Sequence, residues 1–250
     1  IEKIITNSEV TKEKIRKYLH RDDAEVVYSG VDEKEFVNSG YEKYFFYPSR
    51  ITPEKRFEYA IEAFRLFSKK KKEYKLIIAG FLLKKPRELA YFEKLKSLAK
   101  GLDVEFRLDL EDKEIKGLYS NCHAVLFSAM NEDLGLIPIE SMACQKPCIS
   151  VNEGGPTNTI VDGKTGYLVN SEKEMAEKML LLAENPSENE KMGKAGRERV
   201  LKNYTWNILL NKVEKAFKEV SSIKNEKMEY PYVADSMIVQ DRVELAKILS

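Results

Sequence analysis

The sequence lacks several features that would place it at once in a common class of protein. No apolar stretch reaches the roughly 20 residues that a transmembrane helix needs, and no secretory signal is visible. Neither the phosphate-loop pattern G-x-x-x-x-G-K-[ST] nor the dinucleotide pattern G-x-G-x-x-G occurs, which disfavours a P-loop or dinucleotide-binding protein. The first residue is Ile. We therefore expect a fragment of a longer chain, which leaves an export signal upstream open.

Residues that bind metals or form disulfides are scarce. The chain has three cysteines and two histidines. The odd number of cysteines and their apolar neighbours favour reduced, buried thiols in a cytoplasmic protein. No second Cys pair accompanies Cys144 and Cys148, so we expect neither a metal site nor a cofactor. His123 is assigned to the start of a strand, without a catalytic role.

Charges of the two signs are nearly balanced, with 42 basic and 41 acidic residues. This balance disfavours a general nucleic-acid surface and is typical of a soluble protein. Short apolar runs alternate with amphipathic helical patterns along most of the chain. This alternation predicts an α/β fold with a doubly wound parallel, Rossmann-like sheet and a helical C-terminal extension. Strands are expected at residues 44–47, 74–79, 104–108, 123–128, 148–151 and 167–169.

The most informative stretch runs from Met130 to Asn158. A polar loop leads to Pro138, which we expect at the first helical position because its missing N–H would be unpaired there anyway. Ile137 would then be the N-cap, and its side chain has no oxygen to accept hydrogen bonds from the free backbone donors. The start of this helix is therefore predicted to carry open N–H groups.

Open backbone donors and the positive end of the helix dipole predict an anion site at Gly135, Leu136 and Ile137. Glu132 and Glu140 flank this site and can accept hydrogen bonds from hydroxyl groups. A phosphate on the backbone with hydroxyl acceptors on both sides would suit a sugar nucleotide. Glu140 alone could simply complement the dipole, but its combination with the other residues and a following Gly-Gly-Pro turn favours a binding site.

The run N-E-D-L-G-L-I-P-I-E-S-M-A at residues 131–143 resembles the donor-site signature of family 4 retaining glycosyltransferases of the GT-B fold. Residues 152–156 and 162–169 resemble the segments that follow it in that family. The likeness covers about residues 1–218. Two positions depart from the pattern: Asp133 stands where many members have Gly, and Gln145 replaces the usual Gly at the helix end, where a left-handed residue is common.

Two cations, Arg50 and Lys55, lie on the loop that follows the expected strand at 44–47. Ligands gather at the carboxyl ends of strands in open α/β sheets, and two cations there can neutralise a leaving diphosphate without a metal. A solvated basic loop is the alternative. In the family that the sequence resembles, the Arg and Lys of this loop contact the diphosphate.

The resemblance extends to further positions. It implies that Glu140 holds the ribose hydroxyls and that the nucleotide base lies near Arg107 and Leu108. Gly80, at the end of an expected strand, is a further nucleotide-sugar position. Glu132 would orient the donor sugar, and it joins the two cations as the third candidate catalytic residue.

The resemblance also divides the chain. Residues 1–36 would be the end of an acceptor-binding N-terminal domain and the linker, and residues 37–203 the nucleotide-sugar donor-binding domain. Residues 204–220 would form a helix that crosses back to the first domain. Residues 221–250 are an unassigned tail, with a helix expected at 241–249. Most of the first domain would be absent.

These observations predict a hexosyltransferase that moves a hexose from a nucleotide-diphosphate sugar to a glycan or lipid-linked acceptor, with retention of configuration. Similarity to mannosyltransferases favours GDP-mannose as the donor, with UDP-hexoses as the alternative. A donor-binding module without its acceptor domain is one rival hypothesis. A GT-B-type sugar-nucleotide epimerase is another, although it would need ionisable groups around the sugar that the sequence does not show. Peripheral membrane association through the missing domain is a further expectation.

Overall fold

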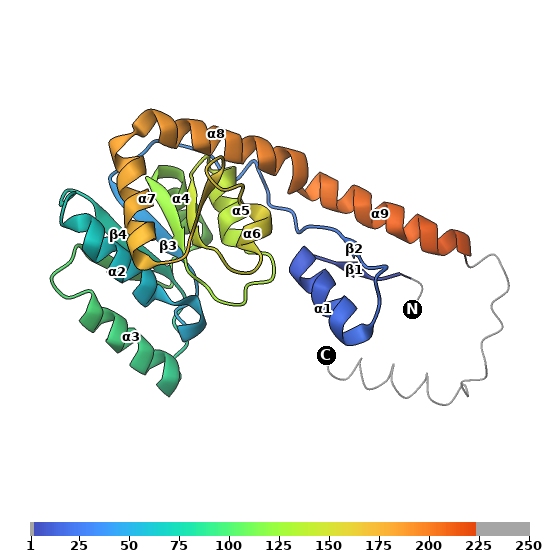
Figure 1. Cartoon of the computed structure of the whole chain (residues 1–250), viewed down its shortest axis with the longest axis horizontal. Helices are drawn as coiled ribbons and strands as arrows, with labels where there is room; N and C mark the ends of the chain where they lie inside the picture. The colour runs from blue at the N-terminus through green and yellow to red at the C-terminus, as the bar shows by residue number, and fades with distance from the viewer. Residues whose placement is uncertain (1–2, 224–250) are drawn as a thin grey trace.

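Six parallel strands form the central sheet of this chain, which the computed structural model describes over residues 3–223 (Figure 1). The strand order is β5-β4-β3-β6-β7-β8, and every neighbouring pair runs parallel. The strands are β3 (Tyr44–Pro48), β4 (Lys75–Gly80), β5 (Val104–Leu108), β6 (Ala124–Phe127), β7 (Cys148–Val151) and β8 (Gly166–Val169). The predicted doubly wound parallel sheet is thus confirmed.

A helix follows each of the six strands of this sheet, and the helices cover its two faces (Figure 1). Helix α2 packs against α7, and α5 packs against α8. The helices are α2 (Phe57–Ser68), α3 (Pro86–Leu98), α4 (Asp112–Asn121), α5 (Leu136–Ala143), α6 (Pro156–Thr159), α7 (Glu172–Glu184), α8 (Pro186–Asn203) and α9 (Trp206–Ile223). In the part of the chain that the structure describes, none of the helices has both the length and the apolar character needed to cross a membrane.

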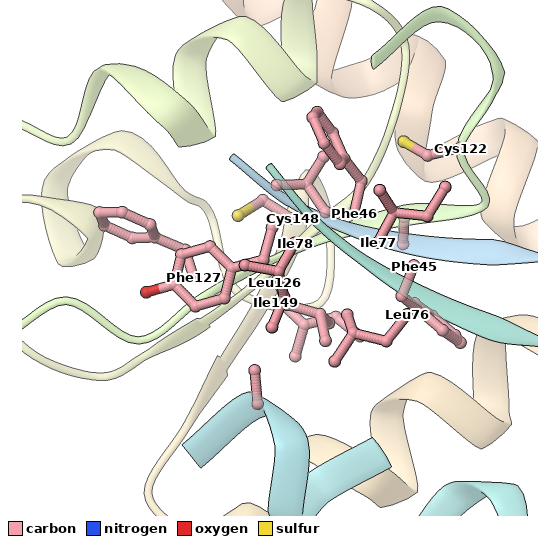
Figure 2. Packing of buried hydrophobic residues seen from close by; sticks show 14 of the residues in the cluster. Phe45, Phe46, Leu76, Ile77, Ile78, Cys122, Leu126, Phe127, Cys148 and Ile149 are labelled. Atoms are coloured by element: carbon pink, nitrogen blue, oxygen red, sulfur yellow. The ribbon is translucent and has the colours of Figure 1, made fainter. Parts of the chain in front are cut away.

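The core lies on both faces of β3 and β6, whose residues are all buried. Phe45 packs on Phe67 and Tyr74 on one face, with ring centroids 5.0 and 5.7 Å away. The next residue, Phe46, projects to the opposite face and meets Tyr119 of α4 at 5.1 Å. Figure 2 shows this packing of apolar side chains around the central strands. Strands that are buried on both faces have continuous apolar sequences. For this reason these strands could be predicted from the sequence.

A smaller unit precedes the large sheet. Strands β1 (Ile5–Thr6) and β2 (Glu25–Val26) pair in parallel and flank α1 (Glu9–Leu19) in the sequence, so this unit is a strand–helix–strand motif. Ser8 caps α1 by accepting a hydrogen bond from the backbone N–H of Thr11 at 3.1 Å. Helix α9 extends from α8 toward this unit (Figure 1) and joins it through an ion pair between Lys3 and Glu219.

The linker between the two units is fastened to the large sheet by two cations, one of which is fully buried. Lys146 is fully buried, and its Nζ donates to the Oδ1 of Asn38 at 2.8 Å and to the carbonyl of Gly40. Arg197 of α8 donates to the carbonyl of Phe36 at 2.9 Å and to that of Ala143 at 2.6 Å. The linker therefore has a fixed path beside α4 and α5. The helix expected at residues 241–249 lies outside the described residues.

Candidate functional site

The sheet changes its direction of growth between β3 and β6, and ligands bind at such switch points in open α/β folds. The loop after β3 carries Lys55, and the loop after β6 carries Glu132. The Nζ of Lys55 donates to the Oε2 of Glu132 at 2.7 Å, and the two side chains are 17% and 28% exposed. The structure thus brings together two of the three candidate catalytic residues.

The backbone around Lys55 is held in place by side chains of the core strands. The hydroxyl of Tyr47 donates to the carbonyl of Lys55. The hydroxyl of Ser128 lies within hydrogen-bonding distance of the carbonyls of Lys55 and Arg56, at 3.2 and 2.8 Å. Arg56 takes a left-handed conformation with φ 48° and ends the short 3-10 turn Pro53–Lys55. These contacts fix the position from which the lysine side chain projects.

The Gly154-Gly155 turn after β7 packs directly on the loop of Glu132. The N–H of Gly155 donates to the carbonyl of Glu132 at 2.7 Å. A Cβ at Gly154 would lie 2.5 Å from that carbonyl oxygen, and one at Gly155 would lie 2.5 Å from the oxygen of Asp133. Neither position has room for a side chain, which is the physical reason for two consecutive glycines here.

An ion pair adds the β3–α2 loop to the same cluster. The guanidinium of Arg56 bonds both carboxylate oxygens of Glu153, at 3.1 and 3.0 Å, and its Nε donates to the carbonyl of Ser128 at 2.6 Å. The loops after β3, β6 and β7 therefore form one connected structure at the carboxyl edge of the sheet.

The predicted start of the central helix was wrong by two residues. Helix α5 begins at Leu136, and its N-cap is Gly135 with φ 79°, not Ile137. Glycine adopts this conformation without steric cost. Pro138 is the third residue of the helix, where its missing N–H costs nothing because first-turn N–H groups have no partner within the helix. No side chain in the described part of the chain caps the helix. The N–H groups of Leu136 and Ile137 thus still lie in an uncapped first turn.

Glu140 consequently occupies the fifth helical position, past the first turn where a carboxylate best complements the dipole. It lines a hollow of about 270 Å³ between the linker, α4 and α5, together with Asp32, Asp112 and Leu136. Its Oε2 accepts a hydrogen bond of 2.5 Å from the hydroxyl of Tyr119. Burial raises the pKa of Glu140, whereas the bond from Tyr119 lowers it.

Two other predicted positions lie at the end of β4 and the loop beside it. Arg50 is exposed on the β3–α2 loop. A Cβ at Gly80 would lie 1.8 Å from the carbonyl oxygen of Ser49, so this glycine allows the two backbones to touch. Close backbone packing alone therefore accounts for Gly80.

The two residues expected near the nucleotide base do not line the hollow beside Glu140. Arg107 donates to the Oε2 of Glu105 through Nε at 3.0 Å and Nη2 at 2.5 Å, and Glu105 also accepts from Lys75 at 2.6 Å. Leu108 is partly buried against the core. The guanidinium of Arg107 is thus bonded to Glu105, which lies two residues earlier on the same strand.

Some contacts of this region were not foreseen from the sequence. Tyr119 lies 21 residues before Glu140 and on another helix, and no motif connects them. Lys14 of α1 forms an ion pair with Asp133, so this departure from the family pattern contacts the N-terminal unit. Within residues 3–223, no group of three or more His, Cys, Asp or Glu side chains is placed to hold a metal ion.

His123 lies away from these loops. It is buried just before β6, its Nε2 is 3.2 Å from the Nδ2 of Asn189, and burial lowers its pKa to about 4.

The geometry of these loops can be compared with known proteins. The family model for glycosyl transferases group 1 matches residues 31–199. The chain belongs to this family. Its six-stranded sheet is the Rossmann-like domain of a GT-B glycosyltransferase.

Several glycosyltransferase relatives match over most of the chain. A probable sucrose-phosphate synthase of Thermosipho melanesiensis is 32% identical over 225 residues, which cover 81% of this chain and 51% of the relative. The alpha-1,3/1,6-mannosyltransferase ALG2 of Dictyostelium discoideum is 32% identical over 173 residues, which cover 63% of this chain and 41% of the relative. The chain spans about half the length of the curated relatives that it matches.

A solved structure of Anabaena HepE in complex with UDP and glucose superposes with a TM-score of 0.77 at 17% identity. The superposition covers 87% of this chain and 63% of HepE. At this identity the likeness shows the glycosyltransferase fold.

Proposed function

We propose that this chain contains the donor-binding domain of a family 4 glycosyltransferase. It would move a hexose from a nucleoside-diphosphate sugar to a glycan or lipid-linked acceptor, with retention of configuration. One observation carries the proposal: Glu132, which pairs with Lys55, lies on the loop that leads into the uncapped start of α5, and Leu136 of that start lines the hollow with Glu140. An anion-binding helix start between a cation and a hydroxyl acceptor suits a nucleoside diphosphate.

Each part of the donor has a partner in this arrangement. Glu140 accepts the ribose hydroxyls inside the hollow. Backbone N–H groups at Gly135, Leu136 and Ile137 bind the phosphates, with the helix dipole adding to the attraction. The sugar then lies beside Glu132, which accepts hydrogen bonds from its hydroxyls and orients it.

Two cations complete the diphosphate site. Lys55 is 2.7 Å from Glu132 and is oriented before any ligand arrives. Arg50 projects from the same loop and is exposed. Because positive groups placed where charge develops stabilise a transition state most, these two residues neutralise the diphosphate as it leaves.

The transfer step needs no protein nucleophile. The bond between the anomeric carbon and the phosphate oxygen breaks, and the nucleoside diphosphate keeps the electron pair. The acceptor oxygen bonds the anomeric carbon on the same face, and its proton passes to an oxygen of the leaving phosphate. In the structure Glu132 is paired with Lys55 and Glu140 is bonded to Tyr119. Both contacts support binding roles for these carboxylates.

The donor proposed first is GDP-mannose, with a UDP-hexose as the alternative. The likeness to a mannosyltransferase supports the first, and the complex of HepE with UDP and glucose supports the second. Since the chain spans about half of its relatives, donor binding without transfer is the second candidate function. Peripheral membrane association through a preceding domain and a cytoplasmic location stay predictions.

Thermal unfolding in the presence of GDP, UDP, GDP-mannose and UDP-glucose tests the binding site. A ligand at 100 times its Kd stabilises the folded state by about 2.7 kcal/mol, which corresponds to roughly 5–10 °C in Tm. We expect stabilisation by nucleotides of one base class. The changes Glu140→Ala and Lys55→Ala should each reduce the shift by about half or more, because a roughly tenfold weaker affinity leaves the ligand at only about 10 times its Kd. His123→Ala and the exposed Lys173→Ala should preserve it.

A full shift that survives both Glu140→Ala and Lys55→Ala would overturn the site assignment. Recording donor hydrolysis and transfer, with this chain and with a longer one, then separates a transferase from a donor-binding module.

A further inference from the structure

Tyr119 is a fully buried residue of α4 whose ring is fixed from two sides. Phe46 of β3 meets it edge-to-face, with centroids 5.1 Å apart and planes at 89°. Phe36 of the linker meets it in the same manner, at 5.7 Å and 79°. Such edge contacts favour one ring orientation, and the close-packed core leaves no space for another. The direction of the hydroxyl is therefore set by the sheet and the linker.

That hydroxyl meets the carboxylate of Glu140. The distance from Oη to Oε2 is 2.5 Å, within the range of strong bonds between a hydroxyl and a carboxylate. Glu140 lines the hollow between the linker, α4 and α5. One carboxylate oxygen is thus held by the protein, and among residues 3–223 no donor bonds Oε1, which leaves it for a ligand.

We propose that Tyr119 is a positioning residue that orients the Glu140 carboxylate to receive the two hydroxyls of a ribose. This inference rests on the proposed function, because it assumes that Glu140 contacts the nucleotide. It adds a residue that does not touch the ligand and acts only through Glu140. The ribose hydroxyls that Glu140 is proposed to contact form a vicinal diol, which 2′-deoxynucleotides lack.

A carboxylate accepts from both hydroxyls of a diol only when it is ionised, because the protonated acid is itself a donor. Burial raises the pKa of Glu140, and Asp112 of α4 raises it further, whereas Tyr119 and Lys116 lower it. Lys116 is engaged with Glu35 of the linker and with Asp112. The other titratable groups around Glu140 are Asp32, across the hollow, and the buried Cys144 at the end of α5. Tyr119 is therefore the largest influence that keeps Glu140 ionised.

The test measures the affinity of this chain for GDP and UDP by calorimetry between pH 5 and 8, with 2′-deoxy-GDP and 2′-deoxy-UDP in parallel. Wild-type affinity should fall as the pH drops through the pKa of Glu140. In Tyr119→Phe the midpoint should move to higher pH, because a hydrogen bond to the ionised form is lost. The preference for ribose over deoxyribose should shrink roughly 3- to 10-fold, in line with the loss of one such bond.

Tyr44→Phe is the matched control. Tyr44 is also buried, and its hydroxyl donates to the carbonyl of Leu118 at 2.8 Å, next to Tyr119 in the same helix. This change removes the buried hydroxyl of a β3 residue that bonds the backbone of α4, and it does not touch Glu140. It should leave the pH midpoint and the ribose preference unchanged. Equal shifts in Tyr44→Phe and Tyr119→Phe would overturn the positioning role, since both would then report only on helix stability.

Two further variants make every outcome decisive. If Glu140→Gln binds as tightly as wild type, the proposed nucleotide site is wrong. If Glu140→Gln binds weakly while Tyr119→Phe keeps the wild-type midpoint, only the positioning role is wrong. Should Tyr119→Phe not fold, Tyr119→3-fluorotyrosine retains the ring and carries a more acidic hydroxyl. Its stronger bond should move the midpoint to lower pH, and an unchanged midpoint would refute the proposal.

Discussion

Lys55 and Glu132 pair across two loops that are 77 residues apart in the sequence, with Nζ 2.7 Å from Oε2. The pair lies at the switch point of the sheet, and both partners are mostly buried. A lysine with a flexible four-carbon stem loses considerable rotamer freedom when it is fixed in a site. In this structure the ion pair with Glu132 already restricts the rotamers of Lys55, so part of this entropy is lost on folding and not on ligand binding.

A first prediction follows for the diphosphate. Lys55→Met should weaken binding of a nucleoside diphosphate by about 10-fold or more, because a hydrogen bond to a charged group contributes ~1.5–3 kcal/mol. Binding of the free nucleoside should not change, since it has no phosphate for Lys55 to contact. Calorimetry with both ligands measures the difference, and Lys173→Met on the exposed face of α7 is the control. Equal weakening of nucleoside and nucleotide would contradict the assignment.

A second prediction concerns the stability of Glu140→Gln. The pKa of Glu140 in the folded state is raised above its ordinary value of 4.5, mainly by burial. Its ionised form therefore costs folding free energy at neutral pH, and that cost disappears below about pH 4.5, where the unfolded chain is protonated as well. Glu140→Gln should unfold at higher urea concentration than wild type at pH 7, with the difference shrinking toward pH 4. The variant would thus be more stable and yet bind nucleotide less well.

A third prediction uses His123, whose pKa is lowered by burial from 6.5 to about 4. Below pH 6.5 the imidazole of His123 is protonated in the unfolded chain, whereas in the folded protein it is protonated only below about pH 4. The free energy of unfolding should therefore fall by about 3 kcal/mol over this interval. His123→Gln should remove that part of the slope in urea titrations from pH 4.5 to 7. The exposed His20→Gln is the control, and an unchanged slope in His123→Gln would count against the burial argument.

A fourth prediction separates two glycines. Gly155→Ala should destabilise the fold by about 1–3 kcal/mol, because its Cβ would lie 2.5 Å from the carbonyl oxygen of Asp133. Gly117 lies in α4, and a Cβ there would meet nothing within 4 Å. Gly117→Ala should therefore stabilise by about 0.5–1 kcal/mol. Urea unfolding measures both changes, and a neutral Gly155→Ala would show that the two loops can separate.

The fold was predictable because the central strands β3 and β6 are buried on both faces and because the strands alternate with helices that carry apolar residues at helical spacing. The ends of helices were less predictable where a glycine and a proline stand close together, because either residue can mark the start of a helix. Pro138 was taken as the first helical residue, but Gly135 with φ 79° starts the turn earlier. Gln145 shows the opposite case: it adopts the left-handed conformation, with φ 56°, at the place where the family pattern has glycine.

The site was partly predictable, since the carboxyl ends of neighbouring parallel strands must meet at one edge. This rule explains why Lys55, after β3, and Glu132, after β6, come together. The contact of Tyr119 with Glu140 depends on how two helices pack, which no local pattern encodes. The partner of Arg107 was available in the sequence, because residues two apart on a strand share a face and Glu105 stands there.

Arg56, Glu153 and the Gly154-Gly155 turn connect the loops after β3, β6 and β7, and this connection matters for protein engineering. Exchanging only the segment after β6 for that of a relative should not transfer the relative's donor preference. The backbone of this segment packs against the two glycines after β7, and Glu153 of the β7 segment is in turn bonded to Arg56 of the segment after β3. A successful graft would have to carry all three segments as a set.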